Sequence, residues 1–133
     1  PVTRRKSSPR LMVFDTSLMT ATSGIGRIVY ESDPARRGHL IESAVGARLL
    51  ARAPEEGFEL FWWREGTSEV DFVASRNGSL SAIEVKGGGE ARQSGMAEFL
   101  SRHPEAKRIV VGGSSAGACS LDDFLRDRAP LFF

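Results

Sequence analysis

Hydrophobic and polar positions follow two different periods along this chain, and the change of period separates the predicted elements. Between residues 32 and 53 the apolar positions recur at helical spacing. Ser32-Asp33-Pro34 supplies a capping side chain and a proline for the first turn, and Pro54 is predicted to end the helix. The inward positions of this helix are predicted to be Ile41, Ala44, Val45, Leu49 and Leu50.

Three strands are predicted after this helix. Residues 58–64 are rich in aromatic side chains, while residues 69–75 and 79–86 are β-branched and alternate with period 2. Asn77-Gly78 predicts a two-residue turn between the last two strands, because these residues tolerate positive φ angles.

The flanking segments complete the predicted order of elements. We expect a strand at residues 11–14, a turn or helix cap at Asp15-Thr16-Ser17, a loop at 20–28, a helix at 90–102, a strand at 108–111 and a helix at 121–128. The helix, three antiparallel strands, helix, strand and helix from residue 32 onward predict an α/β fold. Its αβββαβ core has a mixed central sheet flanked by helices.

Length and charge divide the chain into a short arm and one domain. The 133 residues fit a single domain over residues 11–133, preceded by a basic arm or linker at 1–10. A net charge of +1 gives no global case for nucleic-acid binding, so any basic surface must be local. The arm, with Arg4, Arg5, Lys6 and Arg10, is one candidate, and a frayed terminus is the alternative.

The remaining composition indicates a cytoplasmic protein. The single cysteine, Cys119, cannot form an internal disulfide and fits a reducing compartment. No signal peptide is evident, and no apolar run reaches the roughly 18 residues that a membrane span needs. Because the chain starts at Pro1, we expect a piece of a longer polypeptide.

The predicted turn fixes which residues of the hairpin face each other. If Arg76 faces Ser79, then Asp71 lies opposite Glu84, and Glu69 lies opposite Lys86. Alternation predicts one face formed by Glu69, Asp71, Val73, Ala82, Glu84 and Lys86. It predicts an opposite, core-facing side formed by Val70, Phe72, Ile83 and Val85.

Two carboxylates that face each other across a strand pair destabilise the sheet unless something compensates them. The compensation can be protonation of one acid, a cation between them, or full hydration. Lys86 supplies part of it, and Mg²⁺, which favours carboxylate oxygens and retained waters, would supply the rest. The alternative is a solvated charged face on which Glu69 and Lys86 form an ordinary cross-strand pair.

An acid in one strand followed by acid-x-lysine in the next resembles the PD-(D/E)XK restriction-endonuclease-like superfamily. Here the motif is Asp71 followed by Glu84-Val85-Lys86, with Glu42 as the frequent helical fourth member. More narrowly, the chain is similar to the uncharacterised nuclease-like domain at the C-terminus of prokaryotic AAA-type ATPases. The stretches that carry this likeness lie at 8–16, 37–42, 62–64, 69–73 and 83–86.

This resemblance implies a function and a set of roles. Asp71 and Glu84, with the Val85 carbonyl, would hold Mg²⁺ or Mn²⁺, and Glu42 would contact a metal or its waters. Lys86 would orient or deprotonate the water that attacks a phosphodiester of DNA or RNA. The implied partners are nucleic acid and an N-terminal ATPase region of the same polypeptide. The alternative is a catalytically inactive module of this fold that binds nucleic acid or protein.

Other signals change this interpretation little. Glycines at 87–89 follow the lysine where relatives often carry polar residues, which predicts an early strand end and a mobile Lys86. Gly113-Ser114-Ser115-Ala116-Gly117 matches a hydrolase nucleophile pattern, but no histidine follows it. His39 and His103 lack zinc-site spacing, and no Walker A motif is present, so we expect neither zinc binding nor ATP hydrolysis. Trp62 and Trp63 should point opposite ways, one into the core and the other toward a base or a partner.

Overall fold

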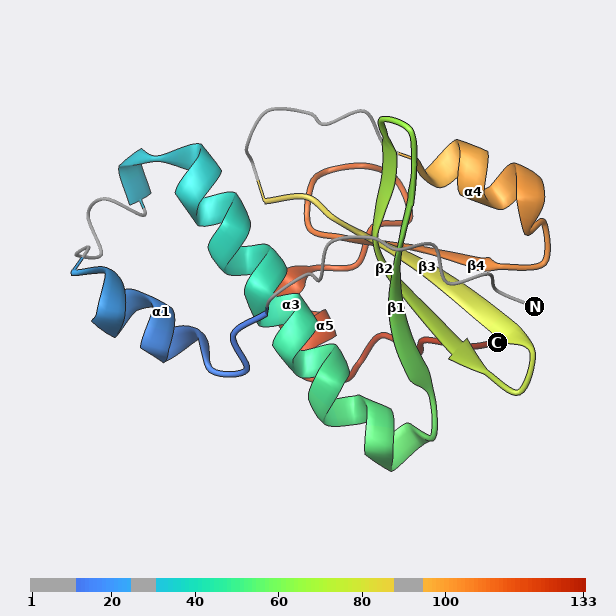
Figure 1. The fold of residues 1–133 in the computed structure, drawn as a ribbon, viewed down its shortest axis with the longest axis horizontal. Helices are drawn as coiled ribbons and strands as arrows, with labels where there is room; N and C mark the ends of the chain where they lie inside the picture. Colours follow the sequence, from blue (N-terminus) through green and yellow to red (C-terminus); the bar gives the residue numbers. More distant parts are fainter. Residues whose placement is uncertain (1–11, 25–30, 88–94) are drawn as a thin grey trace.

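The computed structural model describes residues 12–24, 31–87 and 95–133. It contains a four-stranded sheet with helices on both faces (Figure 1). The elements are α1 (Thr16–Ser23), α3 (Pro34–Glu56), β1 (Glu59–Glu65), β2 (Ser68–Arg76), β3 (Ser79–Val85), α4 (Met96–Arg102), β4 (Lys107–Val111) and α5 (Leu121–Leu125). The basic arm at residues 1–10 lies outside the described residues.

The sheet has the order β1-β2-β3-β4, with β4 parallel to β3 and the other neighbours antiparallel. The connection from β3 to β4 carries α4, as a parallel pair requires. One hydrophobic cluster packs α3 and α5 on one face of the sheet, and a smaller one packs α4 on the other. The predicted α/β fold with a mixed sheet and flanking helices is confirmed.

Helix α3 is the long helix that the apolar period predicts, but Pro54 does not end it. Asp33 accepts hydrogen bonds from the amides of Ala35 and Arg36, and the helix continues to a left-handed cap at Gly57, whose φ is 68°. Pro54 lies in the last turn, where a missing N–H removes a single helical hydrogen bond. The Ala53 carbonyl still accepts from the Gly57 amide.

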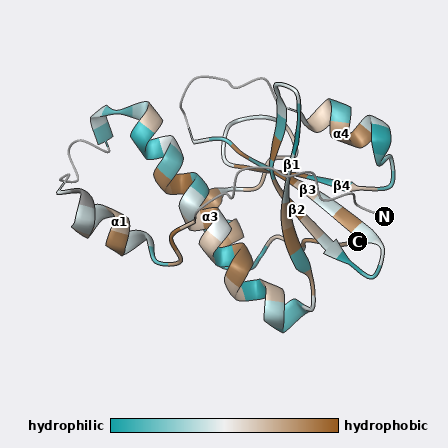
Figure 2. Cartoon of the chain, in the orientation of Figure 1, coloured by the Kyte–Doolittle hydropathy of each residue, from teal (hydrophilic) through white to brown (hydrophobic). Residues whose placement is uncertain are grey.

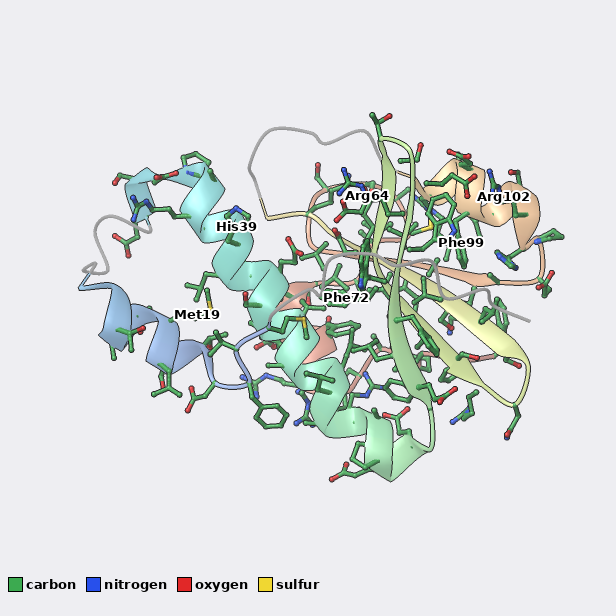
Figure 3. All side chains as sticks on the ribbon, viewed as in Figure 1. Met19, His39, Arg64, Phe72, Phe99 and Arg102 are labelled. Carbon is green, nitrogen blue, oxygen red and sulfur yellow. The ribbon has the colours of Figure 1, made fainter. Side chains whose placement is uncertain are left out.

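The side of α3 that faces the sheet is centred differently from the prediction. Val45 and Leu49 are buried as expected, and so are Gly46 and Arg52, whereas Leu50 is exposed. Figure 2 shows that hydrophilic and hydrophobic positions alternate along the helix. A Cβ on Gly46 would lie 2.9 Å from the ring of Phe72, so glycine lets the helix pack directly on this side chain. Figure 3 shows Phe72 between β2 and α3.

The N-terminal predictions for residues 11–14 and 20–28 are wrong where the structure describes them. Residues 12–14 form no strand, and α1 continues through residues that were expected to be loop. Asp15 caps α1 by accepting hydrogen bonds from the Ser17 hydroxyl and the Ser17 amide, and these two hydrogen bonds lower the pKa of the Asp15 carboxyl. The Thr22 hydroxyl donates a hydrogen bond to the Leu18 carbonyl one turn earlier in the helix. Local side-chain hydrogen bonds thus support a helix in a sequence of weak helix formers. Leu11 and residues 25–28 lie outside the described residues.

The predicted hairpin is confirmed. Asn77 and Gly78 have φ angles of 50° and 84°, as a type I′ turn requires. Arg76 faces Ser79, and the same register continues to Phe72 and Ile83.

A β-bulge between β1 and β2 changes the predicted faces. Phe61 pairs with Val73 and Trp63 pairs with Val70, so two residues of β2, Asp71 and Phe72, oppose the single residue Trp62. Because of the extra residue, the side chains of β2 before the bulge point to the opposite faces from those that the alternation after it would predict.

The prediction that Val70 shares a face with Phe72 is therefore wrong. Val70 lies with Val73 and Ala82 in the cluster that α4 covers, whereas Phe72 and Ile83 lie in the cluster that α3 covers.

The last elements differ in their bounds from the prediction. Residues 90–94 lie outside the described residues, and Gly95 precedes α4 as its cap rather than forming part of it. Strand β4 begins one residue early, at Lys107, and α5 stops at Leu125, well before the predicted end at residue 128. Asp127 then adopts a φ of 59°, which turns the chain. Arg48 of α3 pairs with Asp127 and holds the pKa of that carboxyl below its usual range.

A C-terminal segment that the sequence did not predict completes the core. Leu131 and Phe132 are buried in the cluster between the sheet and α3. Their backbone is held by side chains: Ser81 donates to the Leu131 carbonyl, and Lys107 donates to the carbonyls of Pro130 and Phe132. None of the described helices has the length and apolar composition needed to cross a lipid bilayer.

Candidate functional site

The Asp71 carboxylate lies between β2 and β3. Its Oδ2 accepts a hydrogen bond from the Val85 amide at 2.8 Å. The paired part of the hairpin ends at Phe72 and Ile83, and in a regular ladder the next hydrogen-bonded pair would be Val70 and Val85. Asp71 thus replaces a backbone carbonyl as the acceptor for Val85. The bulge and this hydrogen bond together direct the carboxylate toward the backbone between Glu84 and Lys86.

Glu84 and Lys86 form an ion pair along β3. The Lys86 Nζ donates to Glu84 Oε1, with 12% of the Glu84 side chain and 42% of the Lys86 side chain exposed. The predicted pairs Asp71–Glu84 and Glu69–Lys86 lie beyond the last residues that pair in the ladder. The three motif residues are therefore close in space, but Lys86 contacts the acid of its own strand.

The backbone of Lys86 is fixed although glycines follow it. Its amide donates to the Val111 carbonyl of β4 at 2.8 Å. Gly112, with a φ of 79°, follows β4, and a Cβ at this position would lie 2.7 Å from the Lys86 carbonyl. A Cβ at Gly113 would lie 3.2 Å from the Lys86 Cβ. The prediction of an early strand end is correct, since β3 stops at Val85, but the start of the Lys86 side chain is enclosed by this glycine turn.

Glycines also bring α3 to the end of β3. A Cβ on Gly87 would lie 2.5 Å from the Gly38 Cα, so the two backbones are in direct contact. Glu42 lies one helical turn after Gly38 and therefore on the same side of α3, where it is partly buried. This contact was not predicted, although single glycines inside a helix and directly after a strand are signals in the sequence for close backbone approach.

The donor chemistry fits a hard divalent cation only in part. Asp71, Glu84 and the Val85 carbonyl offer oxygen ligands of the kind Mg²⁺ prefers, and Mg²⁺ accepts few protein ligands because it keeps its waters. Among the residues that the structure describes, no group of three or more His, Cys, Asp or Glu side chains could hold a metal. Two carboxylates and a carbonyl are thus the set available here, and a metal role for Glu42 stays a prediction.

The remaining candidates are two histidines, a cysteine and a serine. His39 is on α3 (Figure 3), and His103 caps α4, with its ring 4.7 Å from that of Phe99. Cys119 is partly buried, and burial raises the pKa of its thiol, which disfavours the reactive thiolate. Ser115 of the G-x-S-x-G match lies in an exposed bend.

Comparisons with known proteins gave a single family. A family model described as a domain of unknown function, DUF4143, matches residues 37–124, which is more than half of the 133 residues. The matched stretch includes Glu42, Asp71, Glu84 and Lys86. No curated protein and no solved structure matches the chain.

Proposed function

The chain belongs to the DUF4143 family, and we propose that it is a PD-(D/E)XK nuclease-like accessory domain that hydrolyses phosphodiesters of DNA or RNA with Mg²⁺. The observation that supports this most is the hydrogen bond from the Val85 amide to the Asp71 carboxylate. It brings an acid from β2 to the backbone segment that carries Glu84 and Lys86. In line with the resemblance, we also propose that this domain is attached to an AAA-type ATPase region.

Each residue of the cluster has a role in this proposal. The Val85 amide orients Asp71, so that the carboxylate can bind a cation together with Glu84 and the Val85 carbonyl. Lys86 would orient the attacking water as an ammonium, or, once it has released its own proton to solvent, take a proton from that water at Nζ. A bound Mg²⁺ would supply charge stabilisation at the phosphate and acidify its own water. For Lys86 to act, its ammonium must leave Glu84 Oε1, and its half-exposed position allows this movement.

A nuclease assay with matched variants tests this proposal. The chain would be incubated with labelled single-stranded and duplex DNA and RNA in Mg²⁺, Mn²⁺ or EDTA. We expect cleavage only with metal, and a loss of about 100-fold or more in Asp71→Asn and in Lys86→Ala. Glu59→Gln, which changes an exposed acid at the far end of β1, is the control and should cleave normally. Equal cleavage by all four proteins would reject the proposal.

The Lys86–Glu84 ion pair favours a second candidate function. A lysine that neutralises the acid beside it lowers the need for a metal, and the described residues contain no three-ligand group. In this case the domain is an inactive module of the same fold that binds nucleic acid or protein. The same assay separates the nuclease from the inactive module. An inactive module that binds nucleic acid would bind it in EDTA and cleave none with metal, and its Asp71→Asn variant would bind as well as the unchanged chain.

A further inference from the structure

The two adjacent tryptophans of β1 have different surroundings. The ring of Trp63 packs edge-on against Phe99 of α4 at 5.6 Å, and the Arg102 guanidinium lies 5.8 Å from it. Figure 3 shows Phe99 and Arg102 on α4, beside the strands. Trp63 is thus a member of the cluster between α4 and the sheet. The prediction that one tryptophan points into the core is confirmed for Trp63.

Trp62 lies on the opposite face of the same strand. Side chains alternate along a strand, and Leu60, two residues earlier, packs in the cluster on the α3 face. Trp62 is partly exposed, and neither hydrophobic cluster of the described residues includes it. In the same part of the chain, the aromatic and cation–π contacts involve Trp63 but not Trp62. The two hydrophobic clusters of the described residues therefore do not account for this large aromatic side chain at the edge of the sheet.

Trp62 is also next to the candidate site. It is the single residue of β1 that opposes the bulge at Asp71 and Phe72. Neighbouring strands lie roughly 5 Å apart, so the backbone of Trp62 is one strand spacing from that of Asp71. Arg64, two positions along the same face, is exposed, and its Nε donates to the Gly66 carbonyl (Figure 3). An aromatic ring and a guanidinium thus share one face of the edge strand, one strand spacing from the backbone of Asp71.

We infer that Trp62 stacks an unpaired base of single-stranded nucleic acid, while Arg64 attracts the backbone beside it. This inference rests on the proposed function and names its substrate class. An aromatic side chain can stack only on a base whose face is open, and the bases of a duplex already stack on each other. A positive side chain beside an aromatic one is the usual composition of a single-strand binding surface.

Tryptophan fluorescence gives a direct test, because the chain holds only these two tryptophans. Trp63→Phe leaves Trp62 as the only indole, and Trp62→Phe leaves Trp63 as the matched control. Each would be titrated with a thymidine oligonucleotide, single-stranded or annealed to its complement, in EDTA so that cleavage cannot interfere. We expect strong quenching of the Trp62 signal by the single strand alone and little change of the Trp63 signal with either ligand.

Affinity in the otherwise unchanged chain provides a second measurement that does not depend on replacing Trp63. By fluorescence anisotropy of a labelled single strand, Trp62→Ala should weaken binding by about 5- to 150-fold, and Trp62→Phe should retain most of the affinity. Unchanged affinity in Trp62→Ala, a preference for duplex, or no binding of either nucleic acid would overturn the inference. Binding of a protein partner at Trp62 without any nucleic acid would do so as well.

The outcome is separable from that of the proposed function. If cleavage requires Asp71 and Lys86 while Trp62→Ala cleaves and binds normally, the inference fails and the nuclease proposal stands. If single strands quench the fluorescence of Trp62 while neither the unchanged chain nor any variant cleaves nucleic acid, the stacking inference stands and the proposal of hydrolysis fails.

Discussion

At the scale of single residues, Asp71 combines a structural role with a proposed chemical one. Its carboxylate accepts from the Val85 amide at the point where the two strands stop pairing. Two substitutions separate these roles. Asp71→Ala removes the hydrogen-bond acceptor altogether, whereas Asp71→Asn keeps an acceptor but removes the charge.

We predict that Asp71→Ala lowers the free energy of unfolding by about 1–3 kcal/mol, because the Val85 amide loses its acceptor. Asp71→Asn keeps an amide oxygen at the same position and should cost less than about 1 kcal/mol. Urea unfolding followed by circular dichroism measures both values. Equal losses in the two variants would mean that the hydrogen bond to Val85 contributes little to stability.

At the scale of elements, the contact between α3 and the end of β3 depends on which of two glycines gains a side chain. A Cβ on Gly87 would press on the backbone of Gly38 at 2.5 Å, whereas a Cβ on Gly38 would have no atom within 4 Å among the described residues. The two glycines touch each other and yet differ in the space around them.

We expect opposite effects from the same substitution at these glycines. Gly87→Ala should destabilise the protein by about 1–3 kcal/mol, because backbone cannot move aside as a side chain can. Gly38→Ala lies inside a helix and should stabilise it by up to about 1 kcal/mol. Thermal unfolding of both variants in the same buffer is the measurement. A loss of stability in Gly38→Ala would contradict the packing described for α3.

The elements also show what the sequence could predict. The turn at Asn77-Gly78 was predictable because only a few residues accept its φ angles, and the turn then fixed the register as far as Phe72 and Ile83. The bulge was not predictable, since the pattern of either strand alone does not reveal the extra residue, which becomes visible only when β1 and β2 are paired. Pro54 misled because a helix tolerates proline in its last turn when a glycine can close it.

For the candidate site, the sequence predicted which segments lie near each other but not the contacts between their side chains. The Val85 amide brings Asp71 to the segment that holds Glu84 and Lys86, and these two form an ion pair at the end of β3, rather than Asp71 and Glu84 facing each other directly. The glycine contacts around Lys86 depend on segments far apart in the chain, which no local pattern relates. Side-chain periodicity therefore indicated the neighbourhood of the site and not its geometry.

At the scale of the whole molecule, stability depends on the segment after α5. Leu131 is 1% exposed and Phe132 is 8% exposed, while Phe133 directly after them is 96% exposed. Arg52, buried on α3, lies within hydrogen-bonding distance of the Ala129 carbonyl, which fixes where this segment enters the core.

We predict that Leu131→Ala lowers the free energy of unfolding by about 2–5 kcal/mol, as expected for a buried leucine in a core without room to collapse. Phe133→Ala is the control and should change it by less than about 1 kcal/mol, the scale of an exposed contact between its ring and Lys107. Guanidinium unfolding of the two variants would show the difference. Similar stability in both would mean that the C-terminal segment is not part of the folded core.

The position of this segment has a consequence for synthesis. All four strands precede residues 131 and 132 in the chain, so the apolar face of the sheet stays partly uncovered until this last segment has been made and has folded onto it. At roughly 5–20 residues per second, this interval lasts on the order of a second or more, during which the uncovered face can bind a chaperone or another nascent chain. Residues 131 and 132 therefore determine when this apolar face is no longer available to other proteins.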